Sequence, residues 1–146
     1  MRLQDAADLA VALEDKAAGD VRSCISNASS IGQHMAIAAY SDPAYAKQKR
    51  AKYQVLKARY VEIRRILKRH PEYAKQFEVM PFNSGYFMCV KPIGVDAEKV
   101  RKHLIAKYST GTIMLSGLIR LAFSTIPKAK LATLFANVNA AILDLR

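Results

Sequence analysis

Arg120 is the residue whose surroundings point most directly to chemistry. It lies in Leu118-Ile-Arg-Leu-Ala-Phe123, a β-prone run in which Ile119, Leu121 and Phe123 alternate and share one face. Arg120 therefore points the opposite way. A guanidinium there must reach solvent, pair with an acid or bind an anionic ligand, because an unpaired buried charge is prohibitive. Its planar, two-pronged donor geometry matches a carboxylate.

Signals for other chemistry are weak. His34, His70 and His103 show no spacing typical of a zinc site or a catalytic triad, and the sequence contains no GxxxxGK[ST] or GxGxxG loop. Cys24 and Cys89 are far apart, so we expect both thiols to be reduced and packed. The N-terminus lacks the layout of a secretion signal, which with unpaired cysteines favours a cytoplasmic protein.

Most of the net charge of +11 is concentrated in one segment of the 146 residues. Residues 47–69 hold ten Lys and Arg and one acid, Glu62. The same segment carries an apolar stripe at helical spacing, formed by Tyr53, Leu56, Tyr60, Ile63 and Leu67. This predicts a long basic helix that packs on one side, with its cations on a solvated face or a phosphate-binding surface. The aromatic residues lie on the stripe, so we expect no specific nucleic acid partner.

The remaining patterns predict an α+β fold with a small, mostly antiparallel sheet of about four strands covered by helices. No run approaches the ~18 apolar residues of a membrane span, and we expect no membrane partner. The expected elements, in chain order, are a helix ending at Gly19-Asp20, a loop over 24–32, a short helix over 33–39, the basic helix capped by Asp42-Pro43, a hairpin of 77–81 and 86–91, a helix capped by Asp96, strands at 112–115 and 118–124, and a helix opened by Pro127 with a buried face of Leu131, Leu134, Phe135, Val138 and Ile142.

Three local sequences, in this order, resemble the C-terminal small domain of class I/II aminotransferases, the pyridoxal-phosphate enzymes of fold type I. Ser26-Asn-Ala-Ser-Ser-Ile-Gly-Gln33 is similar to the family's S-N-x-x-x-x-G-Q segment, and Pro81-Phe-Asn-Ser-Gly-Tyr-Phe87 to its P-x-G-G-Y-F hairpin. The hairpin departs by one extra residue and by Ser84 in place of a glycine. Leu118-Ile-Arg-Leu-Ala-Phe-Ser124 resembles the family's carboxylate-binding strand.

The resemblance implies a role for two arginines and a place for the chain in a longer enzyme. Arg120 would bind the α-carboxylate of the amino or 2-keto acid substrate. Arg22, ten residues before Gly32, matches the arginine with which aspartate-type members bind a side-chain carboxylate in the partner's site. Residues 1–20 would lead in from a large domain outside this sequence, and residues 21–146 would be the small domain of a homodimer.

The family's Schiff-base lysine and pyridoxal-phosphate ligands match no position here. We therefore expect the cofactor in the full-length parent, none on this chain, and no activity from this chain alone. Three alternatives stay open. One is another fold type I enzyme, such as a lyase or decarboxylase, because these chemistries share the fold. Another is a nucleic-acid-binding module that uses the basic helix. The third is an interaction domain that oligomerises through exposed apolar surface.

Overall fold

The computed structural model describes residues 3–26, 29–83 and 85–146. The chain forms two compact units, an N-terminal unit of Met1–Ala46 and a C-terminal unit of Lys47–Arg146. Within the described residues there are five α-helices and four strands, so the predicted α+β class is confirmed. The predicted boundary at residue 20 separates a lead-in helix from an aminotransferase-like small domain, and it stays a prediction.

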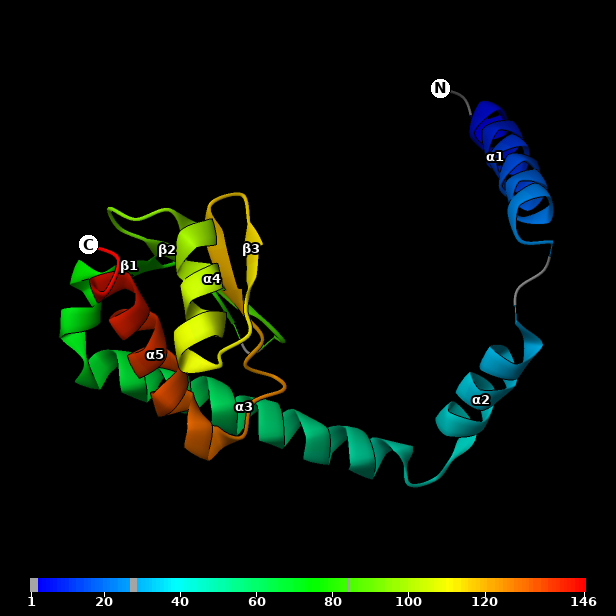
Figure 1. Cartoon of the computed structure of the whole chain (residues 1–146). Helices are drawn as coiled ribbons and strands as arrows, with labels where there is room; N and C mark the ends of the chain where they lie inside the picture. The colour runs from blue at the N-terminus through cyan, green and yellow to red at the C-terminus, as the bar shows by residue number, and fades with distance from the viewer. Residues whose placement is uncertain (1–2, 27–28, 84) are drawn as a thin grey trace. The chain divides into compact units, whose positions relative to one another are not determined.

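Two helices make up most of the N-terminal unit. They are α1 (Leu3–Cys24) and α2 (Ser30–Ser41) (Figure 1). The predicted stop at Gly19-Asp20 is wrong, because α1 runs through both residues in open surroundings, where a glycine weakens a helix without ending it. The predicted loop over 24–32 is too long at both ends. Ser29 caps α2 by accepting a hydrogen bond from the Gly32 N–H at 3.5 Å, and Asn27 lies outside the described residues.

The junction of α2 and α3 (Tyr45–Arg69) is a capped turn. The Asp42 carboxylate accepts a hydrogen bond from the Ala44 N–H at 2.7 Å, and the Asp42 carbonyl accepts one from the Tyr45 N–H at 2.9 Å. Pro43 therefore lies in the turn rather than at the first helical position, which corrects the prediction. The prediction that the Asp42 side chain forms a cap is confirmed, but the helix begins at Tyr45, later than predicted.

A four-stranded sheet organises the C-terminal unit, with the order β1-β2-β4-β3 and every pair antiparallel (Figure 1). Its strands are β1 (Phe77–Val79), β2 (Met88–Pro92), β3 (Ile113–Leu115) and β4 (Leu118–Leu121). The predicted hairpin is confirmed, and its turn is closed by the Asn83 side chain, which accepts the Gly85 N–H at 3.0 Å. Ser84 of that hairpin lies outside the described residues.

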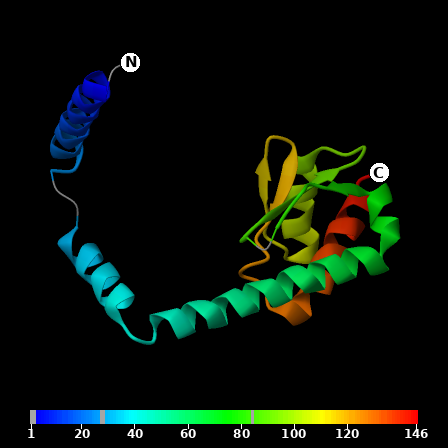
Figure 2. The same cartoon turned by 180° about the vertical axis from the view of Figure 1, so that it is seen from behind.

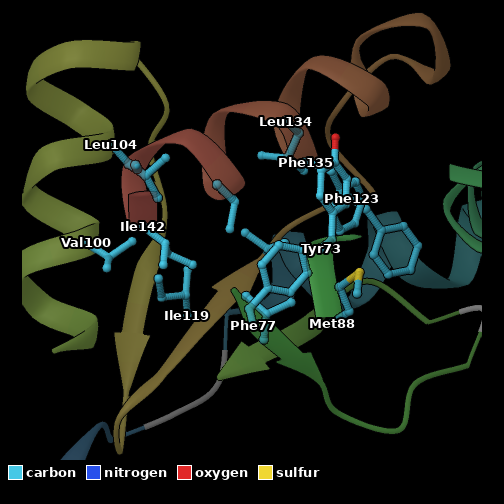
Figure 3. Packing of buried hydrophobic residues seen from close by; sticks show 14 of the residues in the cluster. Tyr73, Phe77, Met88, Val100, Leu104, Ile119, Phe123, Leu134, Phe135 and Ile142 are labelled. Carbon is cyan, nitrogen blue, oxygen red and sulfur yellow. The ribbon is translucent and has the colours of Figure 1, made fainter. Parts of the chain in front are cut away.

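Two helices pack against one face of this sheet. They are α4 (Ala97–Tyr108), capped by Asp96 as predicted, and α5 (Leu131–Leu143), preceded by a 3-10 turn at Lys128–Lys130 (Figure 1). The predicted face of α5 is buried throughout. It meets the sheet's inner face in one core, seen in Figure 3, which includes Phe77, Met88, Val100, Leu104, Ile119, Phe123 and Phe135. Burial of this apolar area is what stabilises the unit.

Helix α3 contributes to the core only near its C-terminal end. Ile63 and Ile66 are buried there, together with Glu62. The predicted stripe is therefore correct at Ile63 and wrong at Tyr53, which is exposed. Helical spacing shows that residues share a face, but it cannot show how far along the helix that face has a neighbour to pack against.

Candidate carboxylate-binding site

Arg120 lies in the middle of β4, between two neighbouring strands. In the antiparallel register it is opposite Cys89 of β2 and Ile113 of β3. Ile119, Leu121 and Phe123 are all buried on the helix-covered side, as the alternation predicts. Arg120 therefore projects from the other face of the sheet, the side turned to the viewer in Figure 2.

The contacts of Arg120 set it apart from the other half-buried arginines of the described ranges. Arg101 makes two hydrogen bonds to the Glu98 carboxylate, at 2.6 and 2.7 Å. Arg59 donates to the backbone carbonyl of Ser124. The Arg120 guanidinium instead lies over the ring of Phe87, 4.5 Å from its centroid, and no described oxygen accepts a hydrogen bond or ion pair from it. Within the described residues, the charge-assisted hydrogen-bonding capacity of Arg120 is thus unused.

The surroundings of Arg120 are mostly apolar. Its register neighbour Cys89 and its strand neighbour Leu118 line a hollow of about 720 Å³, together with Phe87. The other lining residues are Met80, Pro81, Phe82, Asn83 and Met88. Ile113 is 51% exposed on the same face. Arg120 itself does not line this hollow, which therefore gives the guanidinium an apolar neighbour rather than an enclosed anion site.

Arg22 lies elsewhere, in the last turn of α1 rather than at the start of a loop. Its side chain is exposed, and Nη1 donates to the Ser26 carbonyl at 3.4 Å. It belongs to the N-terminal unit and Arg120 to the C-terminal unit, each described by itself. The role of Arg22 in binding a side-chain carboxylate stays a prediction. Cys24 is exposed, so the predicted packing of this thiol is wrong, whereas Cys89 is half-buried.

One polar cluster was missed from the sequence. The Oδ2 atom of Asp144, after α5, accepts hydrogen bonds from three side chains of α4: Lys107 at 2.9 Å, Tyr108 at 2.6 Å and His103 at 2.9 Å. These donors, Lys107 first, hold the pKa of the Asp144 carboxyl far below its ordinary value, and the same contact raises the pKa values of Lys107 and Tyr108. The cluster joins the ends of two helices, and none of its residues lines the hollow formed in part by Cys89 and Leu118.

Every lysine in the described residues is exposed, whereas a Schiff-base lysine needs a pocket that excludes water around the bond it forms. The cofactor of the full-length parent stays a prediction. No group of three His, Cys, Asp or Glu side chains in the described part of the chain could hold a metal ion. Among the helices of the same residues, none has the length and apolar character needed to cross a membrane.

Comparison with known proteins adds no assignment. Neither a protein-family model nor a curated protein matches this sequence.

Proposed function

We propose that this chain is the C-terminal small domain of a fold type I pyridoxal-phosphate enzyme, an aminotransferase, and that Arg120 binds the α-carboxylate of an amino acid or 2-keto acid. One observation carries the proposal. Arg120 is a half-buried guanidinium on the uncovered face of the sheet, with an aromatic ring beneath it and no oxygen partner in the described residues. The α+β class and the hairpin of β1 and β2, both expected from the resemblance, support the same proposal.

The chemistry assigned to Arg120 is positioning. A carboxylate can accept two parallel N–H bonds from the guanidinium, which fixes the direction of the ligand as well as its charge. Phe87 stacks on the guanidinium and restricts its orientation before the ligand arrives. Holding the carboxylate in this way lowers the entropy cost of aligning the rest of the substrate. Acid–base chemistry and the cofactor would belong to the large domain.

Carboxylate binding is testable on this chain alone. A ¹⁵N-labelled sample titrated with pyruvate should show saturable shifts of the Arg120 Nε–Hε signal and of the amides of β4. Arg120→Gln should abolish the saturable shifts of the β4 amides. Arg101→Gln is the matched control, because Arg101 is also half-buried but already paired with Glu98. Absence of any saturable shift at β4 would remove Arg120 from a binding role.

The enzyme class is testable on the complete reading frame. A Ser-x-x-Lys motif upstream of this sequence, and a yellow purified protein, are expected. In that enzyme Arg120→Ala should lower kcat/KM by the equivalent of about 2–4 kcal/mol, since a desolvated charge pair is lost. A colourless protein that still binds pyruvate at Arg120 would keep the carboxylate site and reject the aminotransferase assignment, whereas a yellow enzyme without transamination would favour a lyase or decarboxylase.

A nucleic-acid-binding module is the second candidate, and the exposure of α3 favours it. Nine of the ten cations of residues 47–69 are exposed, and the exposed Tyr53 ring lies 6.0 Å from Lys57 Nζ. Phosphate-driven binding weakens steeply with salt. A fluorescent single-stranded oligonucleotide titrated at several salt concentrations separates the two proposals: a steep salt slope favours this candidate, and only feeble retention at low salt favours the first.

A further inference from the structure

A second hollow in the C-terminal unit is lined by positively charged side chains. It measures about 540 Å³ and is formed by α3, the connection before β2, and the segment after β4. Its lining residues are Lys52, Val55, Leu56, Arg59, Tyr86, Ser124 and Thr125. Two of these are cations and none is an acid, so the hollow is electropositive. Neither Arg120 nor Phe87 lines it.

Several polar groups of one wall already form hydrogen bonds within the protein. The Ser124 N–H donates to the Tyr86 carbonyl at 3.2 Å, and the Thr125 hydroxyl donates to the Ala122 carbonyl at 2.9 Å. Arg59 donates one guanidinium N–H to the Ser124 carbonyl, which fixes the side chain against this wall. An arginine has five N–H donors, so most of its donors are left for a ligand. No described carboxylate pairs with Arg59 or Lys52.

The floor of the hollow is apolar. Val55 and Leu56 lie between Lys52 and Arg59 on the same face of α3, at spacings of three, four and seven residues. Tyr86, 62% exposed, is the aromatic residue among the lining side chains. The two cations are separated by about 10 Å along the helix axis, a length that an aromatic ring and its substituent can occupy.

We propose that this hollow binds a small organic anion with an aromatic or aliphatic body. The anionic group, a phosphate monoester or a carboxylate, accepts hydrogen bonds from Arg59. The apolar body covers Val55 and Leu56 and contacts the Tyr86 ring. Burial of the body supplies affinity that inorganic phosphate cannot gain, and the planar guanidinium supplies direction. The site is separate from the proposed carboxylate site and does not depend on it.

Isothermal titration and amide chemical shifts of the full chain test this site, with phenyl phosphate and phenylacetate as probes. Two controls separate the contributions: inorganic phosphate carries the charge without a ring, and benzyl alcohol carries the ring without a charge. At least one of the two organic anions should bind about tenfold more tightly than either control, because both contributions are needed. Shifts should centre on Val55, Leu56 and Tyr86. The stronger of the two probes identifies the anionic group.

Two valines of α3 provide a matched pair of variants. Val55 is 48% exposed inside the hollow and Val61 is 54% exposed outside it, so neither substitution disturbs the core. Val55→Asp should weaken the tighter probe about tenfold or more by placing a negative charge beside the ligand, and Val61→Asp should leave it unchanged. Tyr86→Ser should weaken it less. Equal effects of the two valine variants, or probe shifts centred on Arg120, would overturn the proposal.

Discussion

The two units of this chain differ in what they bury. In the C-terminal unit, residues from α3, the sheet, α4 and α5 form one apolar core. In the N-terminal unit, none of the residues whose burial is described is buried. Helix α2 is the clearest case, with its largest apolar side chains 64–72% exposed: Ile31, Met35, Ile37 and Tyr40.

This difference shows that a segment can form regular helices without contributing to a hydrophobic core. A helix that is apolar around most of its circumference is stable when other surfaces cover it, whereas a short isolated helix is marginal in water. Helices α1 and α2 therefore depend on local propensity and caps such as Ser29. The C-terminal unit depends on packing. Under the proposed function, the large domain would supply the cover that α2 lacks here.

The largest expected effect breaks the core of the C-terminal unit. Phe135 is fully buried in α5, with its ring 6.5 Å from that of Phe77. Phe135→Ala should lower the free energy of unfolding by about 3–5 kcal/mol, through lost burial and a cavity. If that variant does not fold, Phe135→Leu, at about 1–2 kcal/mol, gives the measurable change. Urea unfolding followed by far-UV circular dichroism measures both.

Ile37→Ala is the matching change in the other unit. Ile37 is 64% exposed, so its removal should change the free energy of unfolding by less than about 0.5 kcal/mol. A loss as large as that of Phe135→Ala would mean that α2 is packed in solution and that the two units do not differ in this way.

Most of the fold of the C-terminal unit could be predicted from the sequence, because its signals are local. The spacing of Leu131 to Ile142, the cap at Asp96 and the alternation around Arg120 each determine a structure within a few residues. The orientation of Arg120 followed from that alternation. Two of the wrong predictions, the packing of Tyr53 and of Cys24, depended on whether another element packs against those residues, which a local pattern does not contain.

The contacts that define the sites could not be predicted, because they join distant residues. Arg59 meets Ser124 across 65 positions, and His103 meets Asp144 across 41. The Phe87 ring beneath Arg120 depends on the register of β2 and β4 and on the path of the chain before β2. A sequence pattern specifies which face a residue takes, whereas its partners depend on register and packing between elements.

The next prediction concerns stability in acid, which should depend on a carboxylate of the C-terminal unit and not on one of the N-terminal unit. Because the pKa of Asp144 is lower in the folded state than in the unfolded state, its charge stabilises the fold above about pH 4, the ordinary value. This contribution is lost as pH falls from there towards the folded pKa. Asp144→Asn should therefore destabilise the chain at pH 7, and the difference from the unsubstituted chain should shrink between about pH 4 and pH 2.

Urea unfolding at a series of pH values measures this difference. Asp8→Asn, at an exposed carboxylate of α1, is the control and should leave the curve unchanged. A constant gap between Asp144→Asn and the unsubstituted chain across the acid range would show that the three donors do not act through the charge of Asp144.

Alanine should have opposite effects at two glycines, one in each unit. An added Cβ meets no atom within 4 Å at Gly19 or at Gly94, so space does not distinguish them. Gly19 lies within α1, where alanine should favour the helix by about 0.5–1 kcal/mol and raise the helical signal without shifting the urea midpoint. Gly94 has a φ of 76° and lies in the turn before α4. Alanine there should lower the free energy of unfolding by about 1 kcal/mol, which would lower the urea midpoint. If Gly19→Ala also shifted the midpoint, α1 would unfold together with the core, because only coupled elements share one transition.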